Sequence, residues 1–319
     1  MWLPEIGGNS IRPHASPACK TQPLQLRKWC SSRMTHEKRV EFFRGLSMTD
    51  CPLCKEESHE SLHLLHTTVW ECMNSRCKLR FAAPQLDDTR LQAAYVKHYY
   101  PRSDNASPEI WENTPMAILH QVFGFVIRQF GQVAGKSLLD YGCGKGNLCR
   151  IASEFGMEAV GIEPDESARA QASTKNSNGV FASLSDLQRA HPNRQFDMIC
   201  LWDSIEHLRS PWTDLSAIRS FSKPGGRLLI TTPNAESLRA RVLGRRWENY
   251  VNPTHFYYFT RTSLRAALAA SRYTDIEELY CPVSYPGHGI LRRGCQRILQ
   301  GLELSGELVF VAHGYLESC

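Results

Sequence analysis

A glycine-rich loop and a downstream glutamate have the residue types and spacing to bind a nucleotide-like cofactor. The loop begins at Asp140 and contains Gly142, Gly144 and Gly146; the glutamate is Glu163, 23 residues after Asp140. Glycines permit a tight turn and let a ligand approach the backbone closely. An acidic residue about 20 residues past such a loop, at a strand end, is placed to hydrogen-bond ribose hydroxyls. These residues predict a cofactor with a free ribose diol.

Two further segments place polar residues at the ends of apolar strands. Residues 196–208 form a strand pattern that ends in Trp202 and Asp203, and residues 222–234 form a tight turn that leads into another strand. Ligands of open α/β sheets bind at the carboxyl ends of the strands. The loop form D-x-G-x-G-x-G differs from the G-x-G-x-x-G fingerprint of dinucleotide-binding proteins. An NAD-binding unit or an incidental turn is nevertheless the alternative interpretation of the loop alone.

Four of the 12 cysteines cluster ahead of this region, at Cys51, Cys54, Cys72 and Cys77. Two pairs of thiolates suit a tetrahedral structural zinc site. The first pair has the usual spacing of two intervening residues, whereas the second pair is separated by four. The sequence predicts a small zinc-ribbon-like module, with free thiols as the alternative.

The elements that would position these residues follow from periodicity. From residue 136 short apolar strands alternate with helices, which predicts an α/β fold with a mostly parallel sheet and helices on both faces. The predicted strands are 137–141, 159–162, 180–182, 198–202, 227–232, 276–280 and 308–312, and the predicted helices include 116–132 and 147–155. The chain divides into a disordered leader (1–45), the zinc-ribbon-like module (46–82), a helical bridge (83–134) and the α/β domain (135–319).

The order of these segments resembles the class I SAM-dependent methyltransferases, which implies a Rossmann-like sheet of about seven strands. The phrases FDMICLWDSIEHL, KPGGRLLITTPN and NPTHFYYFTRTSL resemble the subgroup that contains ubiquinone-biosynthesis O-methyltransferases and sugar C-methyltransferases. The resemblance covers roughly residues 46–319. A cysteine ribbon ahead of a methyltransferase body recurs among the sugar C-methyltransferases.

The resemblance implies a role for each motif residue. The loop residues Asp140, Gly142, Gly144 and Gly146 would surround the methionine end of SAM, and Glu163 would bind its ribose. Trp202 and Asp203 would lie near the methionine moiety or the substrate. The adenine-side residue stays open among Ser183, Leu184 and Asp186.

Methyl transfer to a hydroxyl or an acidic carbon requires a base that removes a proton. We hypothesise that His255 is this base, because it lies in an insertion near 236–260 whose aromatic residues could cover the substrate. His207, which follows Glu206, is the second candidate, since the similar O-methyltransferases use an acidic/His group there, sometimes with a divalent metal. Tyr95, Tyr99 and Tyr100 of the bridge could also reach the acceptor.

Composition narrows the class of partner. The formal net charge is +5, and residues 1–50 alone contribute +4 from eight basic and four acidic residues. The α/β domain therefore shows no stripe of basic residues, and we expect the protein to act on a small-molecule acceptor and not to bind nucleic acid. No apolar run reaches the roughly 18 residues of a membrane span, and without an export signal we expect a cytoplasmic protein.

The predicted function is methyl transfer from SAM to a small molecule, such as a sugar-nucleotide, a glycan precursor or a related metabolite. The alternative enzyme is an O-methyltransferase that acts on a phenolic or quinone precursor. An alternative of another class is a non-catalytic SAM-fold binding module that acts through its zinc ribbon.

Overall fold

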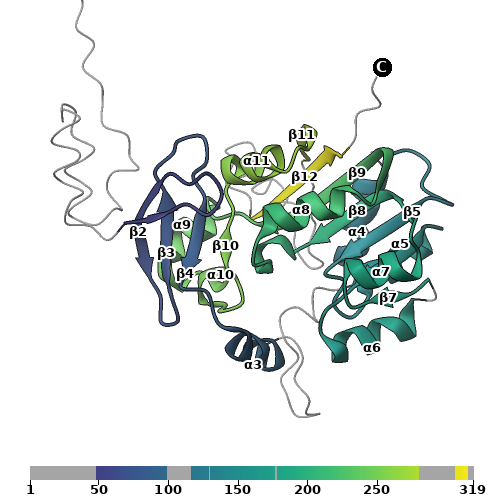
Figure 1. Cartoon of the computed structure of the whole chain (residues 1–319), viewed down its shortest axis with the longest axis horizontal. Coiled ribbons are helices and arrows are strands. Elements are labelled where there is room, and N and C mark those ends of the chain that lie inside the picture. The colour runs from purple at the N-terminus through teal and green to yellow at the C-terminus, as the bar shows by residue number, and fades with distance from the viewer. Residues whose placement is uncertain (1–47, 99–115, 129, 177, 280–305, 315–319) are drawn as a thin grey trace, which may run out of the picture. The chain divides into compact units, whose positions relative to one another are not determined.

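The computed structural model of the chain describes residues 48–98, 116–128, 130–176, 178–279 and 306–314 (Figure 1). The expected leader, Tyr99 and Tyr100 lie outside these ranges. The strands of the described residues form two sheets, of five and seven strands. Among the helices in these ranges, none has the length and apolar character needed to cross a membrane.

The smaller sheet is antiparallel and carries the cysteine cluster. Its order is β1-β2-β3-β4-β10. We call the segment that contains the first four strands, residues 48–83, the Cys module. The strands are β1 (Met48–Asp50), β2 (Glu57–His63), β3 (Thr68–Cys72), β4 (Arg80–Ala83) and β10 (Tyr257–Tyr258). The fifth strand therefore comes from the distant insertion, and it pairs Tyr257 with Phe81 and Tyr258 with Arg80.

The larger sheet has the order β11-β12-β9-β8-β5-β6-β7. The five strands from β9 to β7 are parallel, and β12 and β11 are antiparallel additions at one edge. The strands are β5 (Ser137–Tyr141), β6 (Glu158–Ile162), β7 (Val180–Phe181), β8 (Phe196–Trp202), β9 (Ser222–Pro233), β11 (Thr274–Glu278) and β12 (Glu307–His313). This mixed sheet confirms the predicted α/β class and its seven strands.

Helices connect the strands and begin at local capping signals. Asp165 caps the helix after β6, and Thr260 and Ser263 form a reciprocal capping box for the last helix, which satisfies backbone N–H groups that a helix start leaves unpaired. The helices are α3 (Asp88–His98), α4 (Met116–Arg128), α5 (Asn147–Glu154), α6 (Glu166–Lys175), α7 (Leu184–Ala190), η2 (Ile205–His207), α8 (Pro211–Arg219), α9 (Leu238–Leu243), η3 (Gly244–Arg246), α10 (Glu248–Val251) and α11 (Arg261–Ala270).

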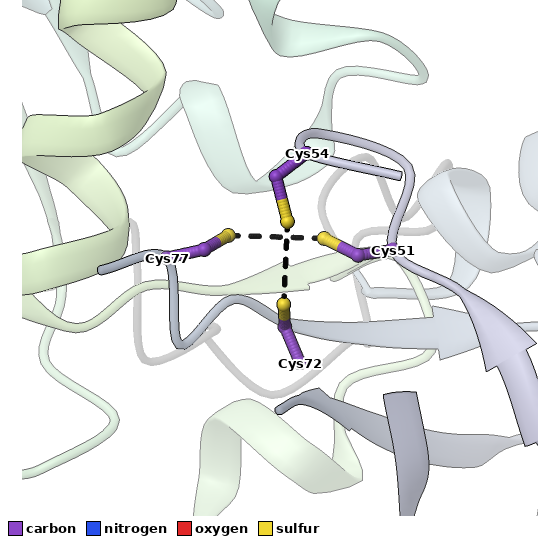
Figure 2. A group of neighbouring side chains, drawn as sticks. All are labelled: Cys51, Cys54, Cys72 and Cys77. Carbon is purple, nitrogen blue, oxygen red and sulfur yellow. Dashed lines mark hydrogen bonds between the residues drawn. The ribbon is translucent and has the colours of Figure 1, made fainter. Parts of the chain in front are cut away.

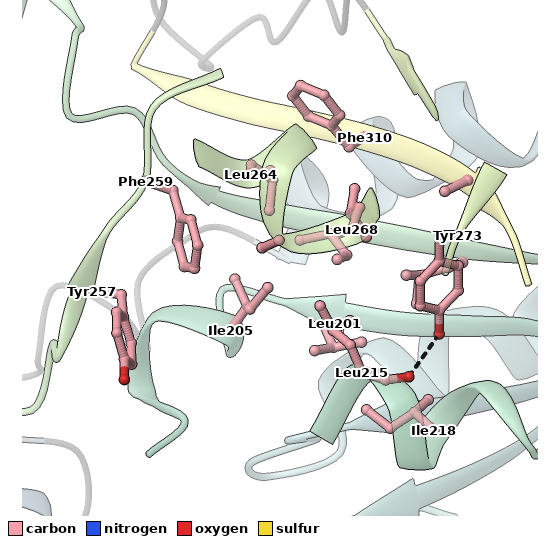
Figure 3. Packing of buried hydrophobic residues seen from close by; sticks show 14 of the residues in the cluster. Leu201, Ile205, Leu215, Ile218, Tyr257, Phe259, Leu264, Leu268, Tyr273 and Phe310 are labelled. Carbon is pink, nitrogen blue, oxygen red and sulfur yellow. Dashed lines mark hydrogen bonds between the residues drawn. The ribbon is translucent and has the colours of Figure 1, made fainter. Parts of the chain in front are cut away.

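The apolar side chains of β5 alternate between two cores, as the period of a strand requires. Leu138 packs with α4, α5 and α6, and Leu139 packs with α7, α8 and α11. Figure 3 shows the second core, where Tyr273 donates its hydroxyl proton to the Leu215 carbonyl at 3.1 Å. Helices therefore cover both faces of the central sheet, as predicted.

The second core continues into the Cys module. Buried residues of the module, among them Leu79 and Phe81, belong to the same cluster as Tyr257 and Phe259. A third cluster joins Val69 and Ala82 of the module to Trp247, Tyr250 and Tyr258 of the insertion. The insertion is therefore packed against the module over its aromatic residues.

The predicted strands agree with the observed ones to within a few residues. The largest difference in length is in β9, which begins at Ser222 because this residue pairs with Phe196 of β8, before an irregularity in the register. The helix expected over 116–132 ends at Arg128, and Gly131 beyond it adopts a φ of 73° that a helix does not allow.

Candidate functional site

The glycine loop joins β5 to α5 and turns tightly over the ends of neighbouring strands. Gly142, Gly144 and Gly146 have φ values of 85°, 52° and 75°, which L side chains rarely adopt. A Cβ at Gly142 would lie 2.6 Å from the Ser204 Oγ, whereas a Cβ at Gly144 would meet nothing within 4 Å. The backbone at Gly144 is therefore open to a ligand. A Cβ at Gly146 would lie 3.0 Å from Ala172 of α6, so this glycine lets α5 pack closely against α6.

Glu163 lies at the same edge of the sheet, directly after the end of β6. The Gly144 N–H donates to its Oε2 and the Asp165 N–H donates to its Oε1, both at 2.9 Å. Its side chain is buried, and burial raises its pKa, which the two amide bonds oppose. Each carboxylate oxygen has a second lone pair, so Glu163 is held in place and can still accept two ribose hydroxyls.

Asp140 lies beneath the loop, at 2% exposure. Its Oδ2 accepts a hydrogen bond from the Cys149 Sγ at 3.6 Å. Burial raises its pKa to about 7, because a carboxylate in a medium of low polarity loses its hydration. This group therefore changes charge near neutral pH, and a cationic ligand would favour its ionised form.

Trp202 and Asp203 stand at the end of β8, next to the loop. Asp203 has a φ of 45°, an uncommon conformation for a residue other than glycine. The Thr231 hydroxyl of β9 donates to its Oδ1 at 2.8 Å, and its own N–H donates to the Thr231 Oγ1 at 3.0 Å. Burial raises the pKa of Asp203 to about 6. Trp202 is half-buried against the core on the α4–α6 side.

A second acidic residue, Glu206, follows on the short helix η2. It is buried, and the Thr232 hydroxyl donates to its Oε2 at 2.9 Å. Burial and the nearby charge of Asp203 raise its pKa well above the usual range.

His207 and His255 meet beside this carboxyl. Their ring centroids are 4.5 Å apart and the rings are nearly perpendicular, at 85°. The His207 Nδ1 lies 3.1 Å from the Thr254 carbonyl oxygen, which fixes Nδ1 as the protonated nitrogen and makes Nε2 the basic one. Burial lowers the pKa of His207 to about 4, and burial together with His207 lowers the pKa of His255 well below its usual value. Both imidazoles are therefore neutral at physiological pH, which is the form that can accept a proton.

The two histidines differ in exposure. His255 is only 2% exposed, whereas His207 is partly exposed. The ring of Tyr95, on helix α3, lies 6.0 Å from the ring of His207. Tyr95 is thus a bridge tyrosine that the structure brings to the candidate base.

Helix α3 spans this edge of the central sheet. Near its start Asp88 pairs with Arg209, beyond the end of β8, at 2.6 Å. One turn later Gln92 donates its amide to the Asp165 Oδ2, beyond the end of β6, at 3.1 Å. The helix therefore crosses from the histidine pair to the glutamate that is placed to bind ribose.

The four cysteines of the Cys module converge on one point (Figure 2). The Sγ atoms of Cys51 and Cys77 are 3.8 Å apart, those of Cys54 and Cys72 are 3.4 Å apart, and all four lie within 4.8 Å of one another. A tetrahedral zinc ion with Zn–S bonds of about 2.3 Å has sulfurs about 3.8 Å apart. The pKa of Cys51 is lowered to about 5, chiefly because the Cys77 thiol donates to it. The donor set and its spacing fit a structural zinc ion.

Glu206, His207 and His255 form a second group whose potential ligand atoms lie within 4.8 Å of one another. Their spacing along the chain did not predict it, because His255 is 48 residues from His207 in sequence. The sequence analysis also did not identify Thr232 and Thr254, the threonines that support the group. The segments TTPN and NPTH, which contain them, are the sequence signal that indicates them.

The candidate adenine-side residues take a local structural role. The Ser183 side chain accepts from the Asp186 N–H and caps α7, and its hydroxyl donates to the Asp186 carboxylate at 2.7 Å. Both polar groups therefore have partners within the turn after β7.

The sequence of this chain is similar to known methyltransferases over the region that carries the glycine loop. A family model described as "Methyltransferase domain" matches residues 114–278. The chain is 29% identical over 184 residues to a ubiquinone biosynthesis O-methyltransferase of Thiobacillus denitrificans, covering 53% of this chain and 79% of that protein. A protein of the same name from Saccharophagus degradans is 28% identical over 185 residues, covering 54% and 78%. A solved SAM-dependent methyltransferase from Archaeoglobus fulgidus has a TM-score of 0.44 at 18% identity, covering 60% of this chain and 93% of that one.

Proposed function

The chain belongs to the methyltransferase-domain family, and from this premise we propose that it methylates a small molecule whose proton is taken by the pair His207 and His255. The protein is a SAM-dependent methyltransferase, in keeping with its family and its similarity to the two O-methyltransferases. The observation that carries the proposal is the ring contact between two neutral histidines, the partly exposed His207 and the buried His255. Family membership favours this enzyme over a non-catalytic binding module.

The donor side of the site is the edge between the ends of β5, β6 and β8. SAM, when bound, supplies an electrophilic methyl group on a cationic sulfur. Glu163 accepts the ribose hydroxyls, the open backbone at Gly144 admits the ligand, and the ionised form of Asp140 stabilises positive charge at the methionine end. Most of the rate in such a displacement comes from holding the two reactants in line.

On the acceptor side, the two histidines differ in burial, and we therefore assign them different roles. His207 is partly exposed, so its Nε2 would receive the acceptor's proton. The acceptor's electron pair would form the new bond to the methyl carbon as the bond from that carbon to sulfur breaks and its electrons pass to the sulfur. We assign the role of base to His207 instead of His255, the base expected from the sequence, because His255 is 2% exposed and lies behind the His207 ring, which it supports.

The leading acceptor is a nucleotide-linked sugar or a related glycan precursor. The Cys module and His255 support this version, because the same combination resembles the sugar C-methyltransferases. Zinc held by Cys51, Cys54, Cys72 and Cys77 would stabilise the module, which is too small to form a sufficient core alone.

The second acceptor is a phenolic hydroxyl on a quinone precursor, with a divalent metal at Glu206, His207 and His255. The names of the two curated relatives and the three converging ligand atoms favour it. In this version the metal would polarise the hydroxyl and lower its pKa. A hard or borderline ion suits this oxygen and nitrogen set, in contrast to the sulfur set of the Cys module.

One experiment tests both versions. The purified protein is incubated with methyl-labelled SAM and either nucleotide-linked sugars or phenolic quinone precursors, with and without added Mg²⁺ or Mn²⁺, and the methylated atom is mapped by NMR. Label on a sugar carbon without added metal supports the first version; label on a phenolic oxygen that depends on the ion supports the second.

Variants test the histidines directly. His207→Gln should reduce kcat by a factor of about 10² to 10⁴, the usual contribution of general base catalysis, and His255→Ala should also reduce it. His120→Gln is the matched control, since this histidine is exposed on α4. Full turnover in both His207→Gln and His255→Ala would exclude the proposed proton transfer.

A further inference from the structure

One arginine of the Cys module reaches into the structure that supports the active site. Arg80, the first residue of β4, donates through its Nε to the Glu71 Oε2 on the neighbouring strand at 2.9 Å. Its Nη1 donates to the Ala235 carbonyl at 3.0 Å, and its guanidinium also hydrogen-bonds to Tyr250 of the insertion. The residue thus joins the module to two separate parts of the methyltransferase body.

Ala235 lies just beyond β9, the strand that supports the acidic residues of the site. Thr231 and Thr232, near the end of β9, hold the carboxyls of Asp203 and Glu206. The Ala235 N–H donates to the Phe259 carbonyl at 2.8 Å, just after β10. Ala235 and Phe259 thus bring the two ends of the insertion together, and Arg80 holds the insertion at this point.

The other end of the insertion is fixed at the residue next to His255. The Phe256 N–H donates to the Glu206 carbonyl at 2.9 Å, and the Phe256 carbonyl accepts from the Ala82 N–H of the module at 2.8 Å. The backbone of one residue, Phe256, thus connects the module to η2, which carries His207. Since Arg80 pairs with Tyr258 across β4 and β10, a shift of β4 would be passed to His255.

We propose that Arg80 is a positioning residue for the acceptor's proton transfer, which it serves by holding the insertion so that His255 stays packed against His207. This inference rests on the proposed role of the histidine pair. It makes the Cys module a component of the acceptor side of the site, while the donor residues on β5 and β6 do not depend on it.

The test uses the full chain with the substitution Arg80→Lys. Lysine keeps a positive charge for Glu71 but lacks the planar fork that reaches Glu71 and Ala235 together. We expect kcat to fall about 10- to 100-fold, since small misplacements of catalytic groups cost this much. The Kd of SAM and the unfolding temperature should stay close to those of the parent protein. The matched control is Arg194→Lys, which alters an arginine–glutamate pair at the opposite end of β6.

A double-mutant cycle separates positioning from general stability. In a His255→Ala background, Arg80→Lys should have no further effect on kcat, because the group through which it acts is gone. Independent, multiplicative losses in the double variant would overturn the inference. So would parent kcat in the single Arg80→Lys variant.

If Arg80→Lys does not fold, Arg80→Gln is the second variant, because its side-chain amide keeps one hydrogen-bonding group. The fraction of folded protein is then measured by titration with SAM, and kcat in the same double-mutant cycle is corrected for that fraction. The two levels of the proposal fail differently. Full activity in both His207→Gln and His255→Ala removes the proposed function. Loss of activity in those variants with an unaffected Arg80→Lys removes only the inference about Arg80.

Discussion

Lowering the pH from 8 to 5 should weaken SAM binding about 90-fold, because Asp140 must be ionised to stabilise the cationic methionine end. Burial raises the pKa of this carboxyl from 3.8 to about 7, so the free protein carries a neutral group in mildly acidic solution. If only the ionised form binds, the apparent Kd grows by the factor 1 + 10^(pKa − pH). That factor is about 1.1 at pH 8 and about 100 at pH 5, a difference of about 2.7 kcal/mol.

Isothermal titration calorimetry measures this dependence directly. At pH 6.5 the ligand should release about 0.8 proton from the protein, visible as a change in heat between buffers of different ionisation enthalpy. Asp140→Asn should bind more weakly at pH 8 and should lose this pH dependence, while Asp87→Asn, an exposed change near α3, should keep it. Ionisation of SAM itself is common to all three proteins and cancels in the comparison.

Two results would refute the reasoning about Asp140. One is a parent Kd that stays constant from pH 5 to 8. The other is an Asp140→Asn variant whose affinity changes with pH as steeply as that of the parent, which would move the titrating group elsewhere, for example to the buried Glu163.

Three further predictions concern the base, the metal and the loop. With SAM saturating, kcat should be flat from pH 7.5 to 5.5 and fall only toward the pKa of His207 near 4, because the base must be unprotonated; a pH–rate profile with its acid limb near 6.5 would contradict this. The protein should contain about one zinc per chain by mass spectrometry, and Cys54→Ser should lose zinc and turnover while calorimetry shows SAM still binding; retained zinc and turnover would count against the site. Gly142→Ala should lower stability by about 1 to 3 kcal/mol in urea unfolding, since its φ is positive and its Cβ would meet Ser204; Gly131→Ala, with a similar φ and open space, should cost less.

The central sheet could be predicted from sequence because its signals are local. Each strand is a short apolar run, and the loop from Asp140 to Gly146 carries its own turn chemistry, so strand, loop and helix follow one another within 20 residues. Glu163 was found for the same reason, since the next strand of a parallel unit ends at the same edge.

The acceptor side could not be predicted in the same way, because long-range contacts assemble it. His207 and His255 approach each other only when the insertion packs on η2. Arg80 and Ala235 are 155 residues apart in sequence. Tyr257 and Tyr258 form a strand of only two residues, which is too short for a sequence pattern to show that it joins the sheet of the Cys module. Such pairing depends on tertiary packing that no local pattern encodes.

The structure of the complex with S-adenosylhomocysteine, the demethylated product, tests the account most directly. We expect the ribose hydroxyls within hydrogen-bond distance of the Glu163 carboxylate, and the thioether sulfur turned toward His207, with His255 behind that ring. A ligand bound away from Glu163, or a sulfur separated from His207 by intervening protein, would contradict the proposed arrangement of donor and base.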